Sequence, residues 1–502
     1  MKKIILSLIL ATLITNPVFA ITEKKDSDIC NNHTHIQKIE IKNGSTLSIL
    51  DCISIGLNNS PIIKQAAFNL EVAKNQVGIA KSIYFPSLSA GIGYNQEFNS
   101  NLEHYEKNDR GFPSVGIVLK DMIWDFGKSN SSIRMEEFYK IVAEYEFQDT
   151  VCSTVFDIKK QYYTLLNAQT MLDIAKMNYE TQEKFVALTQ NLVNNGKKDK
   201  SDLASARTEL YRLKENLLEA QDEVENQKEN LNNSMFLEDA PNYTIYETQT
   251  FRYNPKHTKI YSIHFPSLRK VHNDTTIFQH PNFTYDVAIK KAYENSPDLK
   301  ALEATKKAME QALIYAQRAF YPEIDAAVGY NFLNSNMKST NNNLAIEIAL
   351  NTSINAMHYK YNTRKARAEL NVAEKEIDIF KKNLYFKVKK CINTLDKTQK
   401  EIPLSKDRLK NATEYFELTN KNYFIDKQLE IEFEDARNSY YNSLADYTKR
   451  QYDYNLALID LEKAMHEHLI DYHEDSEHAI HYHAGEENKT LSKLINCNKK
   501  HK

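Results

Sequence analysis

Apolar and polar residues alternate along four short segments, which form two pairs far apart in the chain. The first pair reads SLSAGIGYN from residue 87 and SVGIVLKDM from residue 114. The second pair reads EIDAAVGYNFL from residue 323 and LAIEIALNT from residue 344. Alternation with a period of two is typical of a strand with one apolar face, and it predicts strands at about 87–98, 114–122, 323–333 and 344–352.

Much longer helical segments follow each strand pair. Residues 128–194 contain neither proline nor glycine, and a single helix over this span would be about 100 Å long. The returning segment has a seven-residue repeat at Leu203, Ala206, Leu210, Leu213, Leu217, Ala220, Val224 and Leu231. The second copy keeps this register at Phe433, Ala436, Tyr440, Ser443, Tyr447, Tyr454, Ala457 and Leu461. Such a repeat predicts paired helices in a left-handed supercoil.

The two units are copies of one another. NNSPIIK (58–64) and YFPSLSAGIGYN (84–95) recur 236 positions later as ENSPDLK and FYPEIDAAVGYN. LTQNLVNNGKKDKSDLASAR (188–207) recurs 230 positions later as LTNKNYFIDKQLEIEFEDAR, so the second copy is shorter in the polar loop between its strands. We expect each copy to begin with one helix of about 35 residues that ends at Pro86 or Pro322.

These patterns divide the chain into six parts. They are a signal peptide at 1–20, an N-terminal segment at 21–46, repeat 1 at 47–238, an insert at 239–283, repeat 2 at 284–465 and a histidine-rich tail at 466–502. A break in the helical pattern predicts that the first helical hairpin turns at about 194–202. The aligned segment of the second copy predicts a turn at about 424–432.

The first twenty residues have the three parts of a secretory signal. Lys2 and Lys3 precede the apolar run from Ile4 to Ile14, and Val18-Phe19-Ala20 fits cleavage after Ala20. No later segment approaches the roughly 18 apolar residues of a membrane-spanning helix. In a Gram-negative cell this leaves the periplasm or an outer-membrane β-structure.

The predicted strands suit an outer-membrane β-structure. One face of each is apolar, as in a barrel whose outside meets lipid. Four strands cannot close a barrel, and open sheet edges cannot face lipid, so several chains would share one, and three copies would supply twelve strands. The alternative is a pair of hairpins in a soluble sandwich.

Composition and motifs exclude several classes of function. The formal net charge of −3, with 26% charged residues, provides no basic surface for nucleic acid. Gly127-Lys128-Ser129 lacks the earlier glycine of a phosphate-binding loop, because Met122 stands there, and G-x-S-x-G and H-E-x-x-H are absent. We therefore expect no enzyme and no cofactor, but a passive protein whose energy comes from a partner.

Signal peptide, duplication, strand pairs and helical hairpins together resemble the TolC-type outer-membrane efflux and secretion channels, over about residues 45–465. YFP…GYN and FYP…GYN look like the family's helix-to-strand entries. WDFGK (124–128) is similar to its strand-to-helix exit, where the second copy has INAMHYK instead. VNNGKKDKSDLASAR and YFIDKQLEIEFEDAR resemble its two periplasmic-tip turns.

The resemblance implies a mainly α fold with a small membrane β-barrel. Three chains would share a twelve-stranded barrel in the cell outer membrane, and coiled-coil α-helices would extend into the periplasm as a tunnel. A periplasmic adaptor (membrane fusion) protein and an inner-membrane pump of RND or ABC type would deliver drugs, toxic compounds, metal ions or proteins, in a tripartite efflux or type I secretion system. The alternative is a periplasmic coiled-coil adaptor or scaffold without a barrel.

The resemblance also implies a gate at the hairpin tips. The family's acidic constriction corresponds to Glu432 and Asp435, and its latch to Tyr423 on one hairpin and Ser201 and Asp202 on the other. Gln428 stands where the family has an arginine, and Asp426 replaces the turn glycine. A neutral latch of this kind is typically about half as strong as a charged one.

Two interpretations of the acidic stretch remain open. In a trimer Glu432 and Asp435 would place six carboxylates around a narrow pore, which would select and bind cations. Crowding would also raise some of their pKa values. The other interpretation is an ordinary solvated helix face, and Glu430 and Glu434 are expected to lie on the surface in either case.

Histidine and cysteine raise two further possibilities. The tail holds His466, His468, His473, His478, His481 and His483. With Asp475 and Glu477 they could bind Zn²⁺, Ni²⁺ or Cu²⁺, or they could form a weakly ordered, pH-responsive tail, since their spacing fits no fixed metal motif. Among the five cysteines, Cys30 and Cys52 could pair, but spacing alone cannot establish connectivity.

Overall fold

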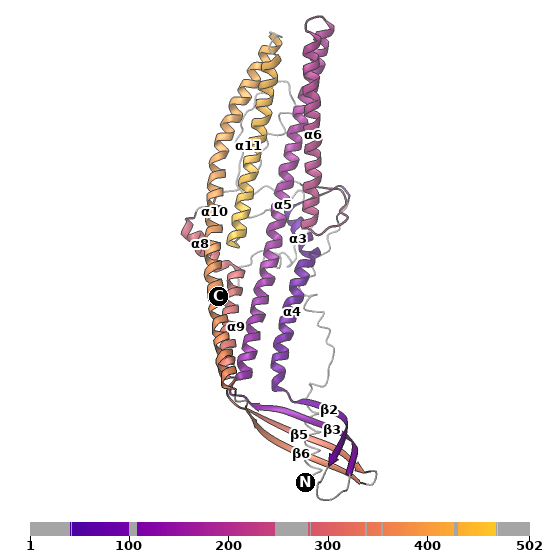
Figure 1. Cartoon of the computed structure of the whole chain (residues 1–502). Helices are drawn as coiled ribbons and strands as arrows, with labels where there is room; N and C mark the ends of the chain where they lie inside the picture. The colour runs from indigo at the N-terminus through magenta and orange to yellow at the C-terminus, as the bar shows by residue number, and fades with distance from the viewer. Residues whose placement is uncertain are drawn as a thin grey trace, which may run out of the picture.

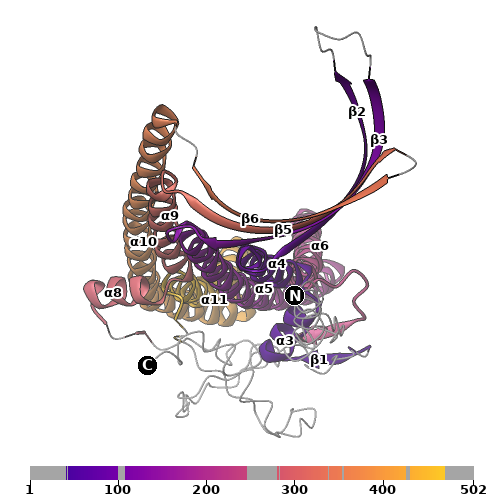
Figure 2. The same cartoon turned by 90° about the horizontal axis from the view of Figure 1, so that it is seen from below.

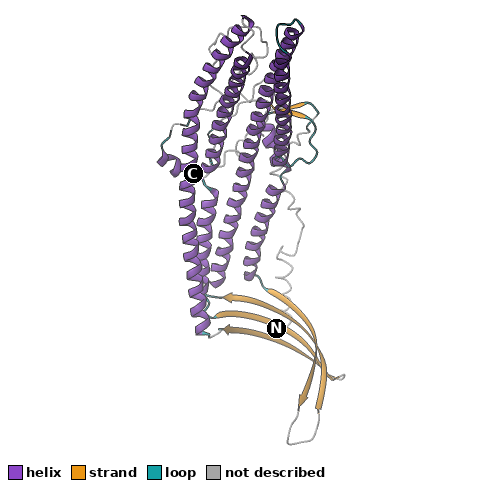
Figure 3. Cartoon of the chain, turned by 45° about the horizontal axis from the view of Figure 1, so that its top comes forward, coloured by secondary structure: helices purple, strands orange, loops and turns teal. Residues whose placement is uncertain are grey.

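The computed structural model describes residues 41, 43–99, 108–245, 280–281, 283–336, 339–352, 355–425, 430–467 and 469. They form an elongated molecule with a curved sheet at one end and long paired helices running away from it (Figure 1). Figure 3 separates the two parts by colour, with the long strands gathered at the sheet end. The predicted fold class is confirmed: the chain is mostly helical, its order of elements repeats, and four strands share one sheet.

The sheet joins the two copies of the repeat. Strands β2 (Ser87–Asn99), β3 (Asn108–Trp124), β5 (Glu323–Asn336) and β6 (Ser339–Asn351) pair in this order, and all neighbours are antiparallel. The central pair, β3 with β5, brings Leu119 opposite Val328. The sheet bends into an arc when seen from below (Figure 2), and β2 and β6 are its outer strands.

Three of the strands are longer than the alternation predicts. The strand expected from residue 114 begins at Asn108. In the second copy, β5 continues to Asn336 and β6 begins at Ser339, so both strands run into the segment expected to be a loop. The predicted strands end where the alternating apolar side chains end. Backbone N–H and C=O groups continue to pair beyond that point, because ladder hydrogen bonds do not require apolar side chains.

Two helices, rather than one, precede the strands in each copy. The first copy has α3 (Ile49–Asn59), α4 (Pro61–Lys81) and the short 3₁₀ helix η2 (Ser82–Tyr84), and the second has α8 (Tyr285–Asn295) and α9 (Pro297–Arg318). The prediction of one 35-residue helix is therefore wrong. Each break lies at a Ser-Pro pair, where the serine side chain accepts the hydrogen bond of a new N-terminus and proline takes the first helical position.

Two pairs of long helices lead away from the sheet. They are α5 (Lys128–Asn194) with α6 (Lys200–Ser234), and α10 (Ala356–Ile425) with α11 (Glu430–Met465). The predicted seven-residue seam is confirmed by burial, since its members on α6 and α11 are buried or half-buried. Among the described helices, none is both long and apolar enough to cross a bilayer.

A tight turn between β3 and α5 sets the direction of the helices. Gly127 has a φ of 80°, which favours glycine, and its N–H donates to Oδ1 of Asp125 at 3.0 Å. The N–H of Ser129 donates to the other oxygen of Asp125, which thereby caps α5. Arg318, at the end of α9, donates to the Gly127 carbonyl at 2.8 Å. The segment WDFGK is thus the strand-to-helix connection that was expected.

The main core lies where the short and long helices meet. It contains Tyr162 and Tyr163 of α5 and Tyr454 and Leu458 of α11, with apolar residues of α3, α8 and α10. A short parallel sheet of β1 (Ser45–Leu47) and β4 (Tyr243–Ile245) lies beside it.

The cysteines do not pair as suggested. Cys52 is a free, fully buried thiol, and burial strongly raises its pKa, so the Cys30–Cys52 disulfide is wrong. Cys152 takes part in a disulfide whose partner lies outside the described residues. The spacing of the cysteines in the sequence did not indicate which of them pair.

Candidate functional site at the tips of the helical hairpins

The first hairpin turns within five residues after Asn194. Gly196 has a φ of 67°, and the N–H of Lys197 donates to the Leu192 carbonyl at 2.9 Å, which closes the end of α5. Ser201 and Asp202 follow in the first turn of α6, where Ser201 is exposed and Asp202 is half-buried. Among the described residues, no hydrogen bond or ion pair joins Ser201 or Asp202 to α10 or α11.

The turn of the second hairpin lies outside the described residues. Gln428 is among the residues between α10 and α11 that are not described. Tyr423 lies in the last turn of α10, but its side chain is outside the described part of the chain. The predicted latch between Tyr423 or Gln428 and Asp202 therefore remains a prediction.

The two predicted gate acids share one exposed face of α11. Glu432 and Asp435 are three residues apart and both exposed. The hydroxyl of Tyr415 on α10 lies 3.5 Å from Oδ2 of Asp435 and donates to it. Desolvation, followed by the charges of Asp435 and Glu432, raises the pKa of Tyr415. This tyrosine therefore stays a neutral donor beside the carboxylates at physiological pH.

Packing on the opposite side of α11 fixes which residues point outward. Phe433 is buried and stacks on Phe185 of α5, with ring centroids 4.6 Å apart. Its ring centroid lies 5.8 Å from that of Phe416 on α10, and Phe416 in turn stacks on Tyr440. Because Phe433 occupies the interior, its helical neighbours Glu432 and Asp435 are directed to the outside.

Glu434 does not behave as expected. It is half-buried, and one of its carboxylate oxygens lies 3.5 Å from Nε2 of Gln182 on α5. The expectation that Glu434 is an ordinary surface residue is wrong. It lies on the side of α11 that packs against the first hairpin, so it differs from Glu432 and Asp435 in what it can reach.

Sequence reasoning missed a buried ion pair between the hairpins. Arg437 on α11 is fully buried, and its Nη2 donates to Oε1 of Glu209 on α6 at 2.7 Å. Burial lowers the pKa of Arg437, and the hydrogen bond from Arg212 is the main cause that lowers the pKa of Glu209. One sequence feature pointed to this arginine: Arg437 corresponds to Arg207 in the other copy of the repeat. That match indicated how the copies align, but not that Arg437 is buried.

Neutral hydrogen bonds add to this contact. Nε2 of the fully buried Gln182 donates to the Ala206 carbonyl at 3.0 Å. The hydroxyls of Thr181 and Tyr441 lie 2.7 Å apart, and Tyr441 also donates to the Met177 carbonyl. Near the tip, α5, α6 and α11 are thus held by a stacked aromatic core, one buried charge pair and buried hydrogen bonds.

Of the six histidines proposed as metal ligands, the structure describes only His466. It follows directly after α11, and its Nδ1 lies 3.8 Å from a carboxylate oxygen of Asp149. His468, His473, His478, His481 and His483 lie outside the described residues, as do Asp475 and Glu477. Metal binding by the tail as a whole remains a prediction.

Comparisons with known proteins place these features in a family. The model of the outer membrane efflux protein family matches residues 52–235 and 288–466, one match for each copy of the repeat. No curated protein sequence matches the chain.

Several solved structures share the fold. The Campylobacter jejuni CmeC outer membrane channel aligns with a TM-score of 0.68 at 15% identity, over 89% of this chain and 89% of its own. The Neisseria gonorrhoeae MtrE outer membrane channel, in its open state, gives 0.66 at 16% identity over 84% and 89%. CusC gives 0.68 at 15% identity over 86% and 95%. At these identities the likeness concerns the fold.

Proposed function

The chain belongs to the outer membrane efflux protein family, and on this basis we propose that three copies form the exit duct of a tripartite efflux or type I secretion system. The duct lies in the outer membrane and extends into the periplasm. A periplasmic adaptor protein and an inner-membrane pump of RND or ABC type supply it. Its cargo belongs to one of four classes: drugs, toxic compounds, metal ions or proteins.

The observation that carries this proposal is the open, curved, four-stranded sheet. Its outer strands expose large apolar side chains, with Ile92 of β2 86% exposed and Ile348 of β6 74% exposed. Open edges and exposed apolar faces are costly in water, and in lipid an edge must be paired. Joining β6 of one chain to β2 of the next pairs the edges, lipid covers the apolar face, and three copies supply twelve strands.

The competing function, a periplasmic adaptor without a barrel, gives this sheet no role. The two functions differ in where the protein is found. We expect the full-length protein in the outer-membrane fraction, as a trimer that resists detergent without heating and dissociates on boiling. A monomer in the soluble periplasmic fraction would instead favour the adaptor.

We further propose that Glu432 and Asp435 form the cation-selective constriction at the periplasmic end. Their exposure on one face of α11 and the nearby hydroxyl of Tyr415 support this role, because both carboxylates are free to face a shared opening in the trimer. Rings of carboxylates attract cations and bind them when closely spaced. Tyr423 and Gln428 opposite Ser201 and Asp202 would act as a neutral latch for the closed state.

Conductance measurements test the constriction. Trimers with Glu432→Gln and Asp435→Asn, reconstituted in planar bilayers, should lose cation selectivity and block by divalent ions. The exposed Glu215 of α6 offers a matched control, because Glu215→Gln removes the same charge away from the tip. Selectivity and block equal to those of the unaltered trimer would rule out the constriction while leaving the channel itself in place.

A further inference from the structure

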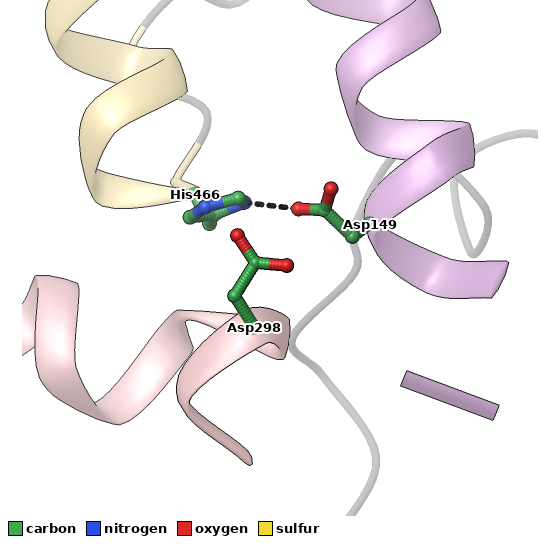
Figure 4. Close-up of side chains that lie close together, drawn as sticks. All are labelled: Asp149, Asp298 and His466. Carbon is green, nitrogen blue, oxygen red and sulfur yellow. Dashed lines mark ion pairs between the residues drawn. The ribbon is translucent and has the colours of Figure 1, made fainter. Parts of the chain in front are cut away.

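Three potential metal ligands from three helical elements converge far from the tip. Asp149 lies on α5, Asp298 in the first turn of α9, and His466 directly after α11 (Figure 4). One possible ligand atom from each lies within 4.8 Å of the others, and all three residues are half-buried. The cluster joins both copies of the repeat and the start of the C-terminal tail.

The backbone holds these side chains in place. Ser296 caps α9 and Pro297 fixes its first turn, so Asp298 is anchored by the same Ser-Pro break that separates α8 from α9. His466 ends α11 with a left-handed φ of 48°, and its ring lies beside both aspartates (Figure 4). The helix dipole at the start of α9 explains why an aspartate suits position 298. It does not explain why Asp149 and His466 meet it.

The electrostatic surroundings leave the two carboxylates poorly compensated. Burial, followed by the charge of Asp298, raises the pKa of Asp149 to about 6, and burial also raises the pKa of Asp298. Three lysines face the cluster, namely Lys387, Lys463 and Lys300. Within the described part of the chain, none of them forms an ion pair with either aspartate, and Lys463 is bound to Asp157 at 2.7 Å.

His466 is suited to ligation in its neutral form. Burial, and then the three lysines, lower the pKa of its imidazole to about 4. A neutral imidazole is the form that binds a metal.

We propose that Asp149, Asp298 and His466 bind a divalent transition-metal ion, with Zn²⁺ the best match. Imidazole favours zinc-like ions over Mg²⁺ and Ca²⁺, and three protein ligands leave one position for water. Ligands about 2.0–2.1 Å from a tetrahedral zinc ion lie roughly 3.3 Å apart. The ligand atoms now lie within 4.8 Å of one another, with 3.8 Å between His466 and Asp149, so the side chains must move closer together to bind the ion.

Such an ion would fasten three elements at one point. It would fix the end of α11 to α5 and to the start of α9. The proposal concerns binding within a single chain, so it stands or falls separately from the channel function.

The test measures zinc binding while excluding the tail. The background is full-length protein in which His468, His473, His478, His481 and His483 are replaced by asparagine, purified after treatment with a chelator. In titration calorimetry with Zn²⁺ alone we expect one ion per chain. Asp149→Asn, Asp298→Asn and His466→Asn should each weaken binding by at least about tenfold, and often more, since even outer-shell changes cost 10–100-fold. Asp222→Asn, at an exposed aspartate of α6, should change nothing.

Two results would overturn the proposal. One is the absence of saturable zinc binding in the background protein, and the other is binding that survives both aspartate substitutions. Circular dichroism checks that each variant is folded, and the two aspartate-to-asparagine variants keep the side-chain shape while removing the mutual repulsion of the carboxylates. X-ray absorption at the zinc edge should show nitrogen and oxygen ligands only, whereas sulfur would assign the ion to a cysteine.

Discussion

Arg437 is the side chain that ties the two hairpins together near the tip. It is a fully buried charge with one carboxylate partner, Glu209, and its Nε and Nη1 have no hydrogen-bond partner among the described residues. Removing one member of such a pair is strongly destabilising, by about 3–5 kcal/mol, because the other charge stays buried alone. Replacing both members with apolar side chains of similar size is often close to neutral.

These magnitudes predict an asymmetric pattern of stability. Glu209→Ala should clearly lower the temperature at which the helical circular dichroism signal is lost, because Arg437 keeps its charge inside the protein. A double variant with apolar side chains of similar size, Glu209→Leu with Arg437→Met, should recover most of that loss. Glu215→Ala, an exposed glutamate two turns further along α6, is the control and should leave the midpoint nearly unchanged.

The pH dependence separates the charge from the packing. The pKa of Glu209 is lowered from its ordinary 4.5, chiefly by the hydrogen bond from Arg212 and in part by the charge of Arg437. The ionised Glu209 therefore contributes stability above that value, and this contribution is lost as pH falls through the folded-state pKa. The double variant should therefore lose less stability than the unaltered protein between neutral and strongly acidic pH. Equal acid sensitivity in the two proteins would contradict a role for the charge.

The tip shows which residue properties a sequence can predict. The repeat and the seam predict that Phe433 and Ala436 face inward, and hence that Glu432 and Asp435 face outward. The burial of Arg437 and the half-burial of Glu434 depend on the first hairpin, whose partner Glu209 is 228 residues away in the chain. A helical pattern cannot specify which polar residues a distant helix will cover.

Periodicity and local capping together determine the helices and strands. The period of two and the seven-residue seam identify the long elements because each buries one face. The break at Ser60-Pro61 was missed although its chemistry is local, since serine before proline is a helix-start signal. The extended hairpins were missed for a different reason, because backbone pairing beyond the apolar residues leaves no hydrophobic pattern.

The proline inside α10 provides a prediction for a single element. Pro403 is exposed in a helix of 70 residues, and proline in a helix interior lacks one hydrogen bond and clashes with the preceding turn, at a cost of about 3 kcal/mol. Pro403→Ala should therefore raise the thermal midpoint. Lys400→Ala, an exposed position one turn earlier, controls for the gain in helix propensity alone. A midpoint no higher than that of this control would contradict the expected cost of proline at this position.

The whole molecule is incomplete as a single chain. One chain leaves the apolar face of its sheet open, with Ile346 and Ile348 of β6 68% and 74% exposed. The sequence predicts four strands in each chain. Because four strands cannot close a barrel, it also predicts that several chains share one. The number of copies is set by the curvature of the sheet and the fit between β6 and β2, which no pattern within one chain encodes.

A pair of arginine substitutions on β6 tests the proposed arrangement. Ile348 lies on the apolar face that would meet lipid, whereas Ala345 lies on the other face, opposite Gly329. An arginine on the lipid face of a membrane barrel costs up to about 2–4 kcal/mol, while residues facing the lumen mainly change selectivity. Ile348→Arg should therefore reduce the amount of detergent-resistant trimer in the outer membrane, and Ala345→Arg should leave trimers whose ion selectivity is altered. If Ala345→Arg abolished the trimer and Ile348→Arg did not, the two faces of the sheet would have to be exchanged. Equal amounts of trimer from both variants would remove lipid contact as the reason for the apolar face.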